Sequence, residues 1–106
     1  MPSNLTVLYN QPKEGEYFNL EYYINTHMPI VKKQWTPLGL KAWQVIKFGP
    51  GSQFYGGVLL TWENPENATS VLTAAESKPV FDDVPNFTNL TPILLPSSIE
   101  DSWELK

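Results

Sequence analysis

The chain of 106 residues contains no cysteine and no arginine, and it has a single histidine, His27. The absence of cysteine excludes disulfides, thiolate catalysis and thiolate metal sites. A formal net charge of −4, with seven lysines as the only strongly basic residues, argues against nucleic acid, which requires basic patches. No membrane span is expected either, because the longest apolar runs, residues 58–60 and 93–95, are far too short.

The amino terminus lacks the charged start and long apolar stretch of a secretory signal, so we expect a cytoplasmic protein. Hydrophobic residues make up 42% of the chain and aromatic residues 13%, which is typical of a folded globular protein. The length fits one core but leaves a small protein that gains from oligomerisation. We therefore predict a single domain over residues 1–106.

Four segments have the composition and alternation of β-strands: residues 4–9, 40–48, 55–62 and 91–95. The second and third are joined by residues 49–52, where three of four residues are glycine or proline. Such a connection is typical of a hairpin.

Two segments between the strands have helical signals. Asn19 is placed to cap a helix that runs to about Gln34, and residues 36–39 end it. Asn64 and Pro65 predict the start of a second helix that runs to about Ser77, before Pro79. Residues 80–89 are expected to be irregular.

The resulting order, β-α-β-β-α-β, predicts a ferredoxin-like α+β fold with both helices on one face of an antiparallel four-stranded sheet. The other face of such a sheet is normally polar. Here several strands carry apolar residues on both faces, so the outer face is expected to be covered by the sheet of a second copy in a homodimer. The opposed sets are Ala42, Ile46 and Phe48 against Trp43 and Val45, and Val58, Leu60 and Trp62 against Tyr55 and Leu59.

His27 lies on the apolar face of the first predicted helix. The residues of this face recur at spacings of three and four: Leu20, Tyr23, Ile24, His27, Val31 and Trp35. Pro29 cannot donate a hydrogen bond to the carbonyl of Asn25, so the helix should kink or break around His27 and leave backbone polar groups free there. A titratable side chain on an inward face beside such an irregularity is a candidate site. The pattern is also compatible with a hydrogen-bonded core histidine.

Three segments together resemble the EthD family of the dimeric α+β barrel superfamily, with fungal members most similar. They are Tyr22-Tyr23-x₃-His27-Met28-Pro29-Ile30-Val31, then Trp35 with Gly39-Leu40-Lys41, and Val80-Phe81-Asp82-Asp83-Val84-Pro85-Asn86-Phe87. The resemblance implies two ferredoxin-like subunits whose sheets close a barrel, and a pocket between the sheet and the helices of each. It also implies that His27 points inward. Relatives in the superfamily include cofactor-free dehydratases, cyclases, decarboxylases, lactone isomerases and monooxygenases, and also haem proteins.

No cofactor is expected. Haem would need His27 as its axial ligand and cations for its propionates, but the chain has no arginine, and Lys32, Lys33 and Lys41 are expected on solvent faces. A metal would need ligands beside His27, and nothing in the spacing brings Asp82 or Asp83 there. A glycine-rich nucleotide loop between a strand and a helix is missing.

The remaining pattern is one histidine in a pocket rich in aromatic residues, which suits a planar, oxygenated, hydrophobic substrate. Asp83 or Asn86 could orient the imidazole. The expected substrate-binding residues are Tyr9, Trp35, Trp43, Tyr55, Phe81, Asp83, Asn86 and Phe87, although each ring also fits a core role.

We predict a cofactor-independent lyase or cyclase that acts on an aromatic polyketide-like ketone. His27 would take a proton next to a carbonyl and return it to a departing hydroxyl, while Tyr23 donates to the developing enolate oxygen. One alternative is an anthrone-type monooxygenase in which Trp35 or Trp43 assists His27. Another is a non-catalytic binder of a hydrophobic metabolite. The tail after residue 95 either covers a pocket or crosses to a partner.

Overall fold

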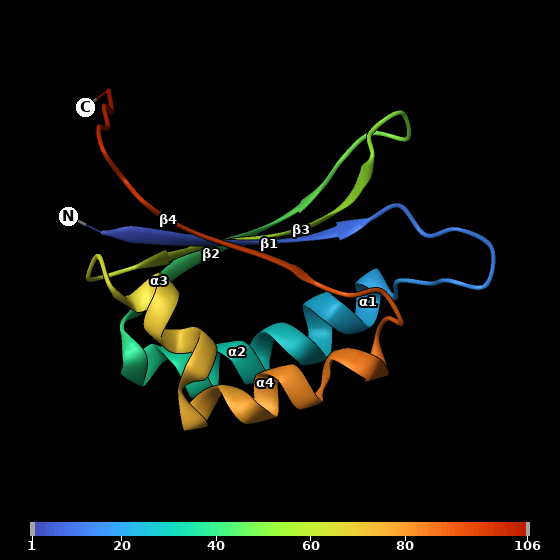
Figure 1. The fold of residues 1–106 in the computed structure, drawn as a ribbon, viewed down its shortest axis with the longest axis horizontal. Coiled ribbons are helices and arrows are strands. Elements are labelled where there is room, and N and C mark those ends of the chain that lie inside the picture. The colour runs from blue at the N-terminus through green and yellow to red at the C-terminus, as the bar shows by residue number, and fades with distance from the viewer. Residues whose placement is uncertain (1, 106) are drawn as a thin grey trace.

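The computed structural model describes residues 2–105, which form a four-stranded antiparallel sheet with all helices on one face (Figure 1). The strands are β1 (Ser3–Asn10), β2 (Leu40–Lys47), β3 (Phe54–Trp62) and β4 (Ile93–Ser98). Their order across the sheet is β2-β3-β1-β4, which is the ferredoxin-like order. The predicted α+β fold class is confirmed.

The core lies between the sheet and the helices. In β1, Leu5, Val7 and Tyr9 are buried, while the residues between them are partly exposed, as period-two alternation requires. Leu5 pairs with Leu60 and Val7 with Val58 of β3, so the two central strands present one continuous apolar surface to the helices.

The first helical segment is continuous from Leu20 to Leu38 and comprises α1 (Leu20–Tyr22), η1 (Tyr23–His27), α2 (Met28–Trp35) and η2 (Thr36–Leu38). Asn19 caps it as predicted, because its side chain accepts a hydrogen bond from the backbone N–H of Tyr22. The segment ends at Gly39, whose left-handed φ of 105° favours glycine.

The irregularity expected near Pro29 takes the form of a π-helical turn. The backbone N–H of Met28 donates to the carbonyl of Tyr23, five residues earlier, so η1 has wider hydrogen-bonded turns than an α-helix. Pro29 follows directly in the first turn of α2, where the missing N–H is tolerated. The chain therefore stays helical through His27 instead of breaking there.

The second helical segment differs from its prediction. It consists of short pieces: α3 (Asn67–Ser70), η3 (Val71–Thr73), η4 (Ala75–Ser77), α4 (Lys78–Asp82) and η5 (Val84–Asn86). The prediction of one helix from Asn64 to Ser77 was wrong, because Ala74 is extended and Asn64 makes no side-chain cap. Pro79 lies in the first turn of α4, a helix that extends into residues 80–89, which were expected to be irregular.

The outer face of the sheet carries apolar residues in adjacent positions. Leu8 of β1 pairs with Ile93 of β4, and Leu59 of β3 and Leu95 of β4 both pair with Thr6 of β1. Leu95 is 47% exposed, and the other three are partly buried. Thr6 places polar atoms among them, so this face is mixed in character.

The fourth strand runs to Ser98, beyond its predicted end, and the tail follows. Figure 1 shows that the tail leaves the sheet on the side away from the helices. Trp103 is 82% exposed, so the described part of the tail does not cover the core. Within residues 2–105, no helix has the length and apolar character needed to cross a membrane.

Candidate functional site

The π-helical turn positions the candidate site. Tyr23 and His27 begin and end η1 and point into the core, where their rings stack at 5.3 Å with an interplanar angle of 16°. Phe87 packs against His27 from the other helical segment, with ring centroids 4.6 Å apart. Both η1 residues are almost fully buried, with exposed fractions of 1% for Tyr23 and 4% for His27. The imidazole is therefore held between two aromatic rings.

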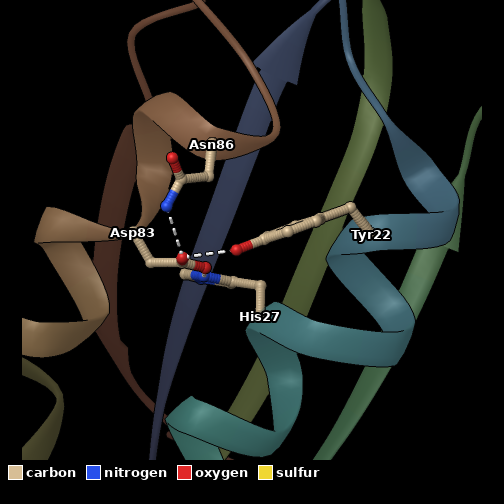
Figure 2. Close-up of polar contacts among 4 residues, drawn as sticks. All are labelled: Tyr22, His27, Asp83 and Asn86. Atoms are coloured by element: carbon tan, nitrogen blue, oxygen red, sulfur yellow. Dashed lines mark hydrogen bonds and ion pairs between the residues drawn. The ribbon is translucent and has the colours of Figure 1, made fainter.

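One edge of His27 is fixed by the carboxylate of Asp83, which follows α4. His27 Nδ1 lies 2.9 Å from Asp83 Oδ2. The other carboxylate oxygen, Oδ1, accepts hydrogen bonds from the Tyr22 hydroxyl at 2.7 Å and from Asn86 Nδ2 at 2.9 Å. Figure 2 shows Asp83 between these donors, which come from α1 and η1 on one side and from η5 on the other. The carboxylate is thus held by three donors.

The pKa values of the pair define its proton arrangement. Burial raises the pKa of the Asp83 carboxyl, but the three donated hydrogen bonds outweigh burial and hold that pKa below its ordinary value. Burial lowers the pKa of His27 and outweighs the opposing effect of Asp83. At neutral pH the pair is therefore a carboxylate and a neutral imidazole. Because a carboxylate only accepts, Nδ1 carries the proton and Nε2 keeps its lone pair.

The remaining edge of His27 borders a narrow cavity between the sheet and the helices, in which about 20 Å³ is open to a water-sized sphere. Its walls are mostly aliphatic and come from both sides, including Val7 and Val58 from the sheet and Val31 and Val80 from the helices. Asp83 is not part of the wall. Within residues 2–105, His27 Nε2 has no hydrogen-bond partner. The arrangement presents one basic nitrogen to an apolar space.

Two tyrosines are the other polar groups in the cavity wall. Tyr9 comes from β1 and Tyr23 from η1, and both are at least 98% buried. Burial raises the pKa of both hydroxyls, and the neighbouring Tyr9 raises that of Tyr23 further. Both hydroxyls therefore stay protonated at physiological pH and act as hydrogen-bond donors.

The predicted site residues fall into three groups. His27, Tyr9, Tyr23, Trp35 and Phe81 line the cavity. Asp83, Asn86 and Phe87 lie behind or beside His27 and do not line the wall. Trp43 and Tyr55 were expected in the pocket but line two separate surface grooves.

The two misplaced aromatic residues have physical explanations. Trp43 is on the helix-facing side of β2, but β2 is an edge strand, and Met28 lies in the walls of both the cavity and the groove beside Trp43. Tyr55 lies where the β1–β3 register shifts, and it packs against Phe18 at 5.0 Å. Strand alternation alone predicts neither placement.

Trp35 lines the cavity, but its indole N–H is already occupied. Nε1 donates to Ser77 Oγ at 2.8 Å, and that hydroxyl donates to the carbonyl of Val71. Trp35 therefore contributes an apolar surface to the cavity, and its N–H is engaged within the protein.

Tyr22 is the polar residue that sequence reasoning missed. It lies five positions before His27, a spacing that puts two residues on different faces of an α-helix. The π-helical turn and the reach of the phenol bring both side chains to Asp83. Pro29 was the available signal, since it marked where the helical period would change.

Ligands for a metal do not gather near His27. Among residues 2–105, no three or more histidine, cysteine or acidic side chains come close enough together to hold a metal ion.

Comparisons with known proteins identify solved structures of the same fold. An EthD-like protein from Ralstonia eutropha JMP134 is 24% identical, with a TM-score of 0.75, over 95% of this chain and 96% of that chain. An ethyl tert-butyl ether D (EthD) family protein from Bacillus halodurans C-125 is 26% identical, with a TM-score of 0.63, over 89% of this chain and 96% of that chain.

A dimeric ferredoxin-like protein of unknown function from Jannaschia sp. CCS1 is also similar. It is 11% identical, with a TM-score of 0.59, over 92% of this chain and 98% of that chain. No protein-family model matches the chain, and no curated protein matches it either. The chain thus has the architecture of EthD-like proteins over nearly its whole length, while the resemblance to fungal members stays a prediction.

Proposed function

We propose that this protein is an EthD-like, cofactor-independent lyase or cyclase that acts on a small aromatic polyketide-like ketone, with His27 as the general acid and base. The observation that carries the proposal is the asymmetry of His27. Its Nδ1 is held by Asp83, while its Nε2 faces an apolar cavity without a protein partner among residues 2–105.

In the proposed reaction, Nε2 removes a proton from the carbon next to the substrate carbonyl, and the electron pair forms an enolate. Asp83 stabilises the imidazolium that results, because its charge and hydrogen bond favour the protonated ring. The imidazolium then gives its proton to a hydroxyl on the neighbouring carbon. That hydroxyl leaves as water while the enolate collapses to a double bond, and His27 returns to its neutral form.

The cavity favours a compact substrate. In this structure about 20 Å³ inside it is open to a water-sized sphere, so a ring-shaped substrate requires the walls to move apart. Aliphatic and aromatic walls favour a flat ring system with few polar groups.

Product analysis by mass spectrometry tests the proposal. Wild-type protein, His27→Gln and the remote control Tyr17→Phe are incubated with hydroxylated two- and three-ring ketones, in air and without oxygen. We expect loss of one water from the substrate in both atmospheres with wild type and control, and none with His27→Gln. A product that gains oxygen only in air would instead indicate a monooxygenase, and retained but unconverted ligand would indicate a binding protein.

We also propose that the protein forms a homodimer through the outer face of the sheet. The apolar residues there, including Leu59 and the 47% exposed Leu95, would be covered by the same face of a second copy. The structural neighbour from Jannaschia sp. CCS1 is itself described as dimeric.

Light scattering coupled to size exclusion tests this assembly. Wild type should have twice the chain mass of 12.0 kDa, and Leu59→Lys should shift it toward the monomer. Glu21→Lys, an exposed change on α1, is the matched control. A monomeric wild type would contradict the proposed dimer.

A further inference from the structure

Tyr9 and Tyr23 are buried residues of the same cavity wall, and their hydroxyls have no protein partner among residues 2–105. Their rings approach to 6.0 Å edge to face, one from β1 and the other from η1. Within the described residues 2–105, neither hydroxyl forms a hydrogen bond. Buried polar groups are normally paired, so each hydroxyl presents an unused donor to the cavity.

Other tyrosines of the chain show the contrast. Tyr17 donates to the carbonyl of Pro85, and Tyr22 donates to Asp83, although both lie nearer the surface where water could serve. The buried indole N–H of Trp62 also lacks a partner among residues 2–105, but Trp62 does not line the cavity. The two cavity hydroxyls are thus unpaired donors that a ligand in the cavity could reach.

The chemistry of these groups defines what fits. A protonated phenol donates one hydrogen bond, so two phenols in one cavity wall match in number the two lone pairs of one carbonyl or enolate oxygen. Tyr23 stacks on His27, so an oxygen held by Tyr23 lies beside the imidazole.

We propose that the Tyr9 and Tyr23 hydroxyls together form an oxyanion site that binds the substrate carbonyl oxygen and stabilises it as an enolate, an assignment that rests on the proposed function. The ligand class is a ketone, or a phenolate that imitates its enolate. Hydrogen bonds to an oxygen that gains charge strengthen during the reaction, and the apolar walls of the cavity increase their effect. Phe87 packs against both rings and helps to fix their orientation.

The test measures binding of 4-nitrophenolate and related nitrophenolates, which resemble an enolate but cannot react. Absorbance titrations give the Kd for wild type, Tyr9→Phe, Tyr23→Phe and the control Tyr17→Phe, each checked for folding by near-ultraviolet circular dichroism. Because each cavity variant loses one hydrogen bond to a charged oxygen, we expect binding about 10- to 100-fold weaker for both and unchanged for the control.

Wild-type affinity in both cavity variants, or no binding to wild type, would overturn the oxyanion site. If a cavity variant does not fold, the absorption maximum of nitrophenolate bound to wild type tests the site. Two donated hydrogen bonds should shift this maximum from its value in an apolar solvent, and an unshifted maximum would overturn the site.

The two proposals fail separately. Tyrosine-dependent nitrophenolate binding without conversion of any ketone would retain the site and reject the enzyme. Turnover that requires His27 but not the two hydroxyls would retain the enzyme and reject the oxyanion site.

Discussion

The two edges of His27 are in opposite states. On one edge, Nδ1 meets a carboxylate whose oxygens are bonded to Tyr22 and Asn86 as well. On the other edge, Nε2 faces a cavity where the neighbouring hydroxyls of Tyr9 and Tyr23 are unpaired among residues 2–105. A fully bonded edge holds the ring in one orientation and tautomer, whereas an unbonded edge is available to a ligand. This difference is the basis for proposing His27 as a binding and catalytic residue.

Removing the imidazole is the most direct way to break this comparison. His27→Ala should lower kcat/KM by about 10²- to 10⁴-fold, because it removes the general acid and base. Turnover kinetics on an accepted ketone provide the measurement, with thermal unfolding as the check that the variant folds. A variant that folds and keeps the wild-type rate would leave His27 as a core residue.

Replacing Asp83 while keeping His27 separates the orientation of the imidazole from its acid–base role. Asp83→Asn should lower kcat by about 10- to 100-fold, since the amide can donate to Nδ1 and stabilise the wrong tautomer. Nitrogen-15 chemical shifts of the imidazole report the tautomer directly. An unchanged tautomer together with an unchanged rate would contradict a positioning role for Asp83.

The pH dependence follows from the pKa of His27, which burial holds below the ordinary value of 6.5. The rate should be constant near neutral pH and fall about tenfold per pH unit below that lowered pKa, because only neutral imidazole accepts a proton.

Stability should fall on the same side of neutrality. Below pH 6.5 the unfolded histidine binds a proton before the folded one does, so acid favours unfolding. The lowered pKa of Asp83 acts in the same direction at more acidic pH, where the unfolded carboxylate is protonated first. Denaturant titrations of wild type and His27→Gln, compared between pH 5 and 8, measure the contribution of His27. If the free energy of unfolding changed equally with pH in the two proteins, His27 would make no such contribution.

The smallest expected effect comes from the outer support of the carboxylate. Tyr22→Phe removes one of three hydrogen bonds to Asp83 and should lower kcat by roughly 2- to 10-fold. Tyr17→Phe, which removes a hydroxyl outside this network, is the matched control. A loss as large as that of Asp83→Asn would mean that Tyr22 has a more direct role than support.

The predicted fold was accurate where local patterns are strong. Strand alternation and the glycine-proline turn located all four strands and the hairpin, and Asn19 was identified as a helix cap. The prediction of the second helical segment was wrong at both ends, because asparagine and proline are each compatible with more than one position relative to a helix. Pro79 followed a helix in the prediction but lies in the first turn of one in the structure. Proline is tolerated at both positions, because neither requires a backbone N–H to donate within the helix.

The candidate site was predictable only in part. Helical periodicity placed His27 and Tyr23 on an inward face, and this placement is confirmed. Which aromatic rings share a cavity depends on strand order and register, so Trp43 and Tyr55 were assigned to the wrong place. The roles of all these residues in binding or catalysis stay predictions.

By itself, the sequence determined the order of strands and helices, the apolar face that carries His27, and the irregular turn that Pro29 imposes. These depend on neighbours within a few positions, where periodicity and backbone sterics act. Only the tertiary structure decided that Asp83, one of the two candidates to orient the imidazole, contacts Nδ1 of His27 from 56 residues away, and that Tyr9 and Tyr23 share one cavity wall. Such contacts form where separate elements pack together, and no local pattern encodes which side chains will meet there.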